Sequence, residues 1–357
     1  MLNTSGNYTG CQPQTINPLI PIILSIIIFV GFMFNCISLW IFWFWVKQWN
    51  STVVLQFNLA ISDALITPAA PLIIVYLLTG HWTFGTFLCQ CKVFLLSTHT
   101  YGSIYFLTLI SVHRYFTVAV KRTAWTKKPF ITKLCLAVWG CLLLQGFSFF
   151  FVVKTSEVHR VTKCLSFHQS EQEVLYFTWN VVVLFFSALI PFFITLICYS
   201  LLSRYILTVN PMNTLSKVMV SKSIQTIFIS LILFVICYIP LHITRAMAAT
   251  LKLFFPALCS LLDTVEVAYY VTWTLSQTNC LIDPILYCFA SDRFRHTFTG
   301  WCSRGNSQRS STDEAHSNQV ESASLDHRRG PLPTVSTTEM EILVSHTVGE
   351  KSDCQWK

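Results

Sequence analysis

Repeated long apolar runs constrain this chain more than any other feature of its sequence. Seven such runs occur, at about 18–45, 53–79, 87–119, 132–153, 175–207, 222–250 and 263–289. A run of about 20 apolar residues is long enough to cross a bilayer as a helix. Because the hydrocarbon core offers no water to satisfy the backbone, such segments are helical. The sequence therefore predicts an all-α membrane protein built as a seven-helix bundle.

The distribution of charge predicts how this bundle is oriented. Only 11% of the residues are charged, whereas a soluble domain carries about 25%. Lysine and arginine concentrate in the segments after the first, third, fifth and seventh runs, as they do in cytoplasmic loops. We therefore expect a multi-pass plasma-membrane protein with an extracellular N-terminus and a cytoplasmic C-terminus. This topology explains the net charge of +8 and argues against a nucleic-acid-binding surface.

The segment before the first run is predicted to be extracellular. Residues 1–17 are polar and contain glycosylation sequons at Asn3 and Asn7. Residues 18–289 then form the predicted membrane domain.

Two further regions follow the last run. In residues 290–302, aromatic side chains recur at helical spacing against basic ones, which predicts an amphipathic helix lying on membrane lipids. Cys302 is a candidate palmitoylation site, although chance placement would give the same pattern. Residues 303–357 are rich in serine, threonine and charged residues, which predicts a disordered cytoplasmic tail.

Two acidic residues inside the predicted spans are the most informative polar side chains. Asp63 lies in the second span and Asp283 in the seventh. Charged groups in a bilayer are costly and mark functional sites, whereas a polar contact between helices contributes only about 0.6 kcal/mol. Two buried carboxylates repel each other unless a cation, a proton or hydrogen-bond donors intervene. The pair therefore predicts a functional polar site inside the bundle.

Motifs distributed over all seven spans carry a resemblance to a known family. They are FNCISLW at 34–40, NLAISD at 58–63, HRY at 113–115, Trp139, Pro191 with Tyr199, FVICYIP at 234–240 and DPILY at 283–287. In their order and spacing they resemble the motifs of rhodopsin-like (class A) G-protein-coupled receptors, over residues 18–302. The resemblance implies a receptor, not an enzyme, with a heterotrimeric G protein as its partner.

The resemblance implies roles in G-protein activation for residues of four spans. These are Arg114, Tyr199, Phe234, Tyr238 and Tyr287. The family usually has an acid next to the arginine, and this chain has His113 instead. An imidazole cannot form that ion pair, so we expect a weakly held inactive state and measurable basal signalling.

The resemblance also implies a site for an allosteric sodium ion, and no other cofactor. The ligands would be Asp63, Ser103, Asn279 and Asp283, which offer the oxygen atoms that a hard cation prefers. His99 lies four residues before Ser103. A protonated imidazole there would replace the charge of the ion, and both alternatives stay open.

The cysteines fit an extracellular face. The resemblance implies a disulfide between Cys89 and Cys164, and the compartment permits one. Cys11 and Cys259 are placed as in the second disulfide of nucleotide receptors. Cys91 is a competing partner for either bond.

Candidate ligand-binding residues lie in the outer halves of the spans. They are Lys92, Phe94, Leu96, His242, Arg245, Tyr270 and Trp273. The arginine fork binds carboxylates and phosphates, so Arg245 predicts an extracellular anionic ligand. The alternative is that its side chain extends towards lipid head groups.

Two further motifs resemble one branch of the family. HITR at 242–245 and AYYVTWTLSQTNCLIDPILY at 268–287 resemble purinergic nucleotide receptors and their carboxylic-acid and lipid-acid relatives. Nucleotide receptors carry basic residues where this chain has Val93 and Trp273. A triphosphate needs several positive contacts, so we expect a small carboxylate or lipid-like acid as ligand. A nucleotide is the alternative, followed by a transporter or a ligand-independent receptor.

The tail suggests further partners. Ser307, Ser310, Ser311 and Thr312 lie beside acidic residues, and phosphorylation would add clustered negative charge there. In receptors of this class such tails are substrates of receptor kinases and are bound by arrestins.

Overall fold

The computed structural model describes residues 16–120, 124–158, 161–164, 173–208 and 214–290. All of them belong to one compact unit, Met1–Trp301. The predicted glycosylation sites Asn3 and Asn7, the amphipathic helix, Cys302 and the tail lie outside the described residues, apart from the start of that helix segment at residue 290.

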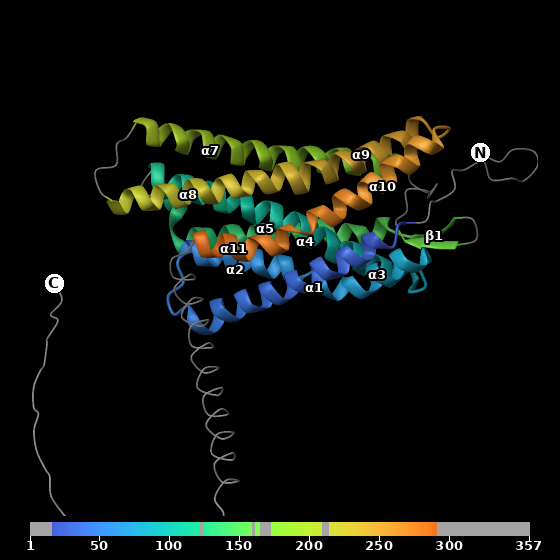
Figure 1. The fold of residues 1–357 in the computed structure, drawn as a ribbon, viewed down its shortest axis with the longest axis horizontal. Coiled ribbons are helices and arrows are strands. Elements are labelled where there is room, and N and C mark those ends of the chain that lie inside the picture. The colour runs from blue at the N-terminus through green and yellow to red at the C-terminus, as the bar shows by residue number, and fades with distance from the viewer. Residues whose placement is uncertain (1–15, 121–123, 159–160, 165–172, 209–213, 291–357) are drawn as a thin grey trace, which may run out of the picture. The chain divides into compact units, whose positions relative to one another are not determined.

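The described chain is almost entirely helical. The helices are α1 (Leu19–Trp40), α2 (Ser51–Ala64), α3 (Ala70–Thr79), α4 (Gly85–Tyr115), α5 (Lys128–Val152), α6 (Glu173–Val183), α7 (Ile190–Thr208), α8 (Thr214–Leu233), α9 (Ile239–Phe254), α10 (Cys259–Ser276) and α11 (Asn279–Ala290). They run alongside one another as a bundle (Figure 1). Helix α4 is central and contacts α2, α5, α7 and α8. The predicted all-α bundle is confirmed.

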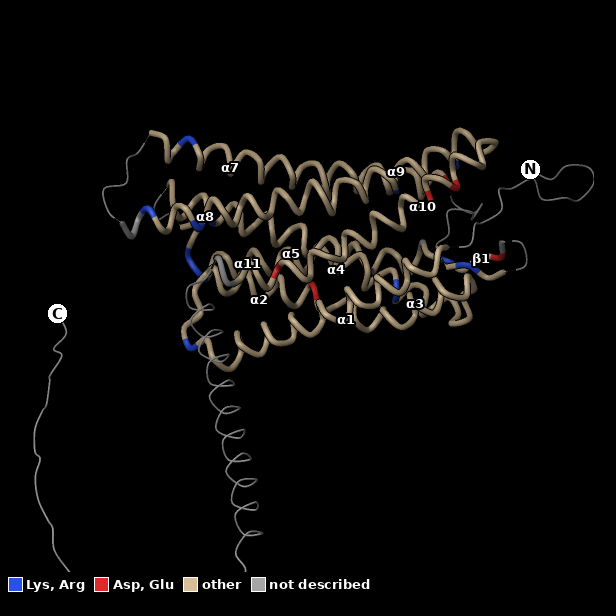
Figure 2. Tube along the Cα trace, in the orientation of Figure 1, with Lys and Arg blue, Asp and Glu red and all other residues tan. Residues whose placement is uncertain are grey.

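Among the described residues, six helical stretches are long and apolar enough to cross a membrane. They are Leu19–Trp45, Ser51–Thr79, Gly85–Val120, Lys128–Phe151, Glu173–Thr208 and Lys217–Phe254. They correspond to the first six predicted spans. Lysine and arginine gather at the end of the bundle where α7 ends and α8 begins, and the middle of the bundle contains two acidic positions, on α2 and α11 (Figure 2).

The seventh predicted span, 263–289, is not one continuous helix. It is divided into α10 and α11 at Gln277 and Thr278. On either side of the break, Ser276 Oγ donates to the Trp273 carbonyl at 2.7 Å and Thr278 Oγ1 donates to the Leu275 carbonyl at 2.7 Å. Such side-chain bonds compete with the helical backbone pattern, which the apolar count alone does not detect.

Wide, π-helical turns follow two of the long helices and interrupt two others. They are η1 (Ile41–Trp45), η3 (Phe116–Val120), η5 (Leu184–Leu189) and η6 (Phe234–Tyr238). Segments η5 and η6 each end two residues before a proline, Pro191 and Pro240. A proline removes one backbone donor and clashes with the carbonyl four residues earlier, and a wide turn relieves both problems. Near Pro68, a short 3₁₀ segment, η2 (Thr67–Ala69), joins α2 to α3.

A two-stranded antiparallel hairpin lies at one end of the bundle, the end where β1 is seen in Figure 1. Strands β1 (Thr155–Val158) and β2 (Val161–Cys164) pair so that Thr155 faces Cys164. The Trp82 amide donates to the Thr162 carbonyl at 2.8 Å. Lys163 Nζ donates to the Gly80 carbonyl at 2.6 Å, where the left-handed glycine (φ 65°) ends α3.

A disulfide fixes this hairpin to α4. It joins Cys89 to Cys164, as predicted, and Cys91 is a free thiol. Cys259 is also disulfide-bonded. Its predicted partner, Cys11, lies outside the described residues, so that pairing stays a prediction.

Candidate functional site

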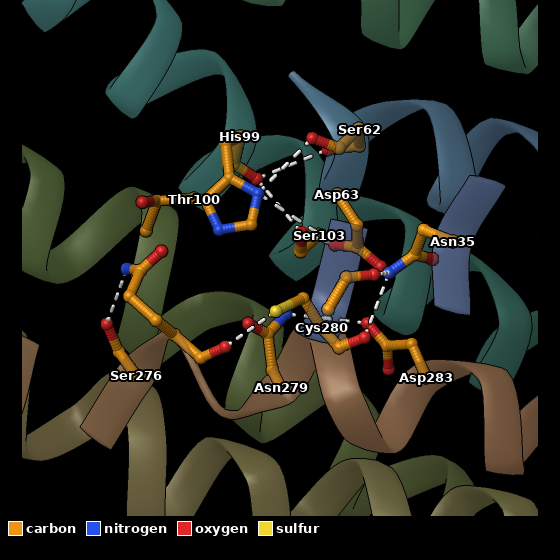
Figure 3. Close-up of polar contacts among 12 residues, drawn as sticks. Asn35, Ser62, Asp63, His99, Thr100, Ser103, Ser276, Asn279, Cys280 and Asp283 are labelled. Carbon is orange, nitrogen blue, oxygen red and sulfur yellow. Dashed lines mark hydrogen bonds and ion pairs between the residues drawn. The ribbon is translucent and has the colours of Figure 1, made fainter. Parts of the chain in front are cut away.

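The two predicted acidic residues lie together in the middle of the bundle. Asp63 on α2 is 1% exposed and Asp283 on α11 is fully buried. Ser103 Oγ on α4 donates to Asp63 Oδ1 at 2.6 Å. Asn279 Nδ2 lies 3.4 Å from Asp283 Oδ2 and donates to the Tyr238 hydroxyl at 2.6 Å. Figure 3 shows these side chains converging from α2, α4 and α11. We call Asp63, His99, Ser103, Asn279 and Asp283 the inner polar cluster.

His99 is part of the inner polar cluster. Its Nδ1 lies 3.2 Å from the Ser62 carbonyl oxygen and 3.9 Å from Asp63 Oδ1 (Figure 3). A carbonyl oxygen only accepts, so Nδ1 carries a proton and donates to the backbone of α2. Ser62 Oγ donates to the His99 carbonyl at 3.2 Å in return. The imidazole is thus anchored to α2 beside the Asp63 carboxylate.

Three oxygens of the inner polar cluster are buried without a hydrogen bond in the described structure. They are Asp63 Oδ2, Asn279 Oδ1 and Asp283 Oδ1. A buried polar atom without a partner is energetically costly. Carboxylate, amide and hydroxyl oxygens are the ligands of hard cations. The arrangement therefore has the chemistry of a small cation site.

Asn35 next to this cluster has a structural role. Its Nδ2 donates to the Gly31 carbonyl at 3.0 Å and to the Cys280 carbonyl at 2.9 Å, which ties α1 to α11. A side chain at Gly31 would collide with Cys280, so the glycine permits this close contact between the helices.

The residues predicted to act in G-protein activation are only partly brought together. Phe234 and Tyr238 lie in η6 with their ring centroids 5.7 Å apart. Tyr199 packs against Phe228 of α8. The remaining two lie on other helices: Tyr287 packs against Phe42 of η1, and Arg114 lies in the last turn of α4.

A second cluster surrounds Arg245 in the half of the bundle that bears the hairpin. Arg245 Nη1 on α9 donates to the Tyr101 hydroxyl at 3.3 Å, and the guanidinium interacts electrostatically with Tyr176 and Tyr269. The His242 ring stacks on Tyr101 with centroids 5.9 Å apart. His242 is 2% exposed and its Nε2 makes no hydrogen bond in the described structure. We call these five residues the outer cluster.

Trp273, Tyr270 and Leu96 lie in a neighbouring apolar region. Trp273 is buried together with Leu24 and Leu241, and Leu96 and Tyr270 pack against this group. The indole therefore fills apolar space between helices at the position where a nucleotide receptor is expected to carry a basic residue.

Lys92 and Phe94, both predicted to bind ligand, are directed elsewhere. The Lys92 ammonium lies 4.9 Å from the ring centroids of Tyr76 and Trp82, and 3.5 Å from the Cys164 carbonyl oxygen. Phe94 faces α5, with its ring 6.0 Å from that of Phe150. Lys92 thus contacts the hairpin at Cys164 and the aromatic residues Tyr76 and Trp82. The structure brings neither Lys92 nor Phe94 into the outer cluster.

This geometry gives a testable prediction for Lys92. We expect Lys92→Met to keep the ligand response within about threefold of the unchanged protein. The Lys92 ammonium makes cation–π contacts, each contributing about 0.5–2 kcal/mol, which stabilise the hairpin region and do not contact the ligand. Thermal stability should fall instead, and Lys92→Arg should restore it. The measurements are a dose–response curve and a melting curve on the same preparations. A loss of response without loss of stability would show that Lys92 binds the ligand.

A buried acid near the hairpin escaped the sequence analysis. Glu266 on α10 is 8% exposed and interacts electrostatically with Lys163, Tyr76 and Tyr270. Burial lowers the pKa of the Lys163 ammonium, and the Glu266 carboxylate opposes this shift. In the sequence it is one of three acids in the predicted span 263–289, with Asp263 and Asp283, and only Asp283 was singled out. The three tyrosines of the outer cluster were missed as well, because their partners lie on different helices.

Comparison with known proteins identifies the class of protein that these features define. Residues 34–287 match the family described as 7 transmembrane receptor (rhodopsin family). The chain belongs to this family of class A G-protein-coupled receptors, and it is a receptor rather than an enzyme.

Its relatives place it in the purinergic branch. It is 34% identical to purinoceptor 4 of Rattus norvegicus over 293 residues, covering 80% of this chain and 79% of the relative. It is 34% identical to purinoceptor 2 of Homo sapiens, over 77% of this chain and 74% of the relative. It is 32% identical to lysophosphatidic acid receptor 6 of Gallus gallus, over 76% of this chain and 89% of the relative.

Proposed function

We propose that the chain binds an extracellular anionic small molecule at the outer cluster, and that binding activates a heterotrimeric G protein. The observation that carries this proposal is the environment of Arg245. Its hydrogen bond goes to a tyrosine hydroxyl, and no carboxylate of the described residues forms an ion pair with it. A half-buried guanidinium with neutral neighbours attracts an anion.

The chemistry around Arg245 favours a singly charged acid. His242 adds a ring nitrogen without a hydrogen bond in the described structure, and Trp273 adds apolar surface nearby. A lipid-like acid or a small carboxylate would satisfy these groups. Lysophosphatidic acid receptor 6 among the relatives is named for a lipid anion, which supports this ligand class.

The second candidate is a nucleotide, and the purinoceptors among the relatives favour it. Against it stand Trp273, which is buried in apolar surroundings, and Lys92, which is engaged by two aromatic rings. Guanine-nucleotide exchange on an added G protein, measured against a panel of nucleotides, small carboxylates and lysophospholipids, separates the candidates. Activation by a small carboxylate or a lysophospholipid supports the proposed ligand class, whereas activation by nucleotides alone contradicts that class and favours the second candidate.

The orientation proposed from the charge pattern agrees with this function. Basic residues gather at the end of the bundle opposite the hairpin (Figure 2), and this end would face the cytoplasm and the G protein. Receptor kinases and arrestins are proposed as partners of the tail, and membrane lipids as partners of residues 290–302.

The inner polar cluster is proposed to hold a sodium ion. Asp63, Ser103, Asn279 and Asp283 would supply oxygen ligands, and the three oxygens without hydrogen bonds fit this role. Bound there, the ion would neutralise the carboxylates and connect α2, α4 and α11. A protonated His99 beside Asp63 would be the competing positive group.

We expect sodium to lower basal guanine-nucleotide exchange about fivefold, as is typical of coupled sites, when it replaces choline at constant ionic strength. Asp63→Asn should abolish this effect because it removes a charged ligand. His99→Ala tests the competitor. If sodium acts only in the His99→Ala variant, the imidazole rather than the ion occupies the site in the unchanged protein.

A further prediction concerns His113, which is 7% exposed next to Arg114. We expect His113→Asp to lower basal exchange about fivefold, because an ion pair of about 1 kcal/mol would then restrain the arginine. His113→Asn is the uncharged control and should leave basal exchange unchanged. Equal basal exchange in all three proteins would show that this position does not set the inactive state.

A further inference from the structure

The side of α10 that contributes to the outer cluster also carries a buried acid. Tyr269, Tyr270 and Trp273 follow Glu266 by three, four and seven residues, so all four side chains share one side of the helix. Glu266 and Trp273 are 8% and 5% exposed, which places this side inside the bundle. Tyr269 belongs to the outer cluster, and the Glu266 carboxylate therefore lies about one helical turn from that cluster.

Arg245 and Glu266 act on the same tyrosine with opposite charges. Tyr269 interacts electrostatically with the Arg245 guanidinium and with the Glu266 carboxylate. The Tyr270 ring lies 5.4 Å from that of Tyr269, and Tyr270 and Tyr76 also interact with Glu266. A group of tyrosines thus extends from a cation on α9 to an acid on α10. The electrostatic potential falls along this group from Arg245 to Glu266.

Lys163 of the hairpin balances Glu266 only in part. Its ammonium interacts electrostatically with Glu266, and it also donates to the Gly80 carbonyl at 2.6 Å, at the end of α3. Carbonyls at the end of a helix carry partial negative charge, so this cation is shared between two negative groups. Lys163 is more exposed than Glu266, and salt water screens its charge more strongly. The carboxylate therefore keeps a negative field on its side of the tyrosines.

We propose that Glu266 determines ligand specificity, because it excludes acids with more than one negative charge from the outer cluster. This rests on the proposed function, since it requires an anion at Arg245. The first negative charge of the ligand binds the guanidinium. A second one directed towards α10 meets the Glu266 carboxylate, and like charges repel strongly where water does not screen them. A hydroxyl or ammonium group there is attracted instead. The ligand class is thus a singly charged acid whose second polar group is a hydrogen-bond donor.

The test compares acids that differ by one charge in guanine-nucleotide exchange by the full-length receptor. The pairs are succinate with succinamate, and lysophosphatidic acid with its cyclic phosphodiester. The readout is the ratio of their half-maximal concentrations within one variant, which does not depend on the amount of folded protein. We expect Glu266→Gln to shift each ratio about tenfold in favour of the more highly charged acid. Lys163→Met should shift it the opposite way, because the carboxylate then loses its balancing cation.

Asp263→Asn is the matched control. Asp263 is an acid on the same helix, about one turn further from Tyr269 than Glu266 is. Its removal changes the net charge equally and should leave the ratios within about twofold, because its charge is more distant from the outer cluster. Unchanged ratios in Glu266→Gln overturn the proposal. Shifts in the same direction in Glu266→Gln and Lys163→Met, or an equal shift in Asp263→Asn, overturn it as well.

A second measurement reports the potential without any ligand. Tyr269 is partly exposed, and Tyr269→Cys in a Cys91→Ala background is modified on intact cells by anionic and cationic methanethiosulfonate reagents. Adding Glu266→Gln should raise the anionic-to-cationic rate ratio at least about fivefold. Tyr270→Cys serves if Tyr269→Cys does not reach the cell surface. If no acid activates any variant, the proposed function fails. The thiol rates then decide on Glu266 alone: a raised ratio supports its role, and an unchanged ratio overturns it.

Discussion

Arg245→Ala should raise the ligand concentration for half-maximal G-protein activation at least about 30-fold, because truncating one member of a buried charged pair costs about 2–5 kcal/mol. The side chain is held by the Tyr101 hydroxyl and by electrostatic contacts with Tyr176 and Tyr269, so its fork is oriented before the ligand arrives. Arg245→Lys keeps the charge but loses the fork, and should recover only part of the response.

Lys252→Ala is the matched control for this experiment. Lys252 is a second cation on α9, and its ammonium lies 3.9 Å from Glu173 Oε1. Its carboxylate partner makes it a poorer anion site, so its removal should change the response less than about threefold. Surface expression of each variant is measured in parallel. Equal effects of Arg245→Ala and Lys252→Ala would refute a specific role for the outer cluster.

Removal of the disulfide between Cys89 and Cys164 should have the second large effect. Either cysteine changed to alanine is expected to cost about 2–5 kcal/mol of folding stability, because the bond closes a long loop. The two cysteines are 75 residues apart in sequence. We expect lower surface expression, a lower melting temperature and loss of response, because the hairpin would no longer be fixed to α4.

Cys91→Ala controls for this change. Cys91 lies two residues from Cys89, is a free thiol and should tolerate alanine with little effect. The double variant Cys89→Ala/Cys164→Ala should resemble the single variants, because each single change already breaks the bond. A melting temperature that responds as strongly to Cys91→Ala would contradict this assignment.

The sequence predicts those parts of the fold that depend on local composition. Apolar runs marked six spans correctly, because crossing a bilayer requires long continuous helices. The seventh was located but not its division at Gln277 and Thr278, where side-chain hydrogen bonds interrupt the backbone pattern. The contact between Cys89 and Cys164 came from resemblance to a family, since spacing alone does not fix a pairing.

The candidate site was harder to predict, because it depends on the rotation of each helix. Lys92 and Phe94 were expected near Arg245, yet Lys92 contacts Trp82 and Phe94 contacts α5. A change of one residue turns a side chain about 100° around the axis. Sequence gives the order of residues along α4 but not which neighbour each one faces.

The tyrosines of the outer cluster were missed because the sequence does not show which residues of different helices face one another. Tyr101, Tyr176 and Tyr269 come from three helices and come together around Arg245. Each is an ordinary aromatic residue in its own segment. The inner acids were easier to single out, because a carboxylate inside an apolar run is costly wherever its partners lie.

The wide turns before Pro191 and Pro240 have a consequence for how the length of this chain can vary in evolution. A wide turn of this kind is equivalent to one residue inserted into an α-helix. Loss of one residue within η5 or η6 can restore regular α-helical geometry. The helical segments on both sides then still direct their side chains towards the same neighbours. The same loss elsewhere in these helices would rotate one half by about 100° against its neighbours. Single-residue gaps in alignments of such receptors therefore belong in these turns, and helices of unequal residue count can present equivalent surfaces.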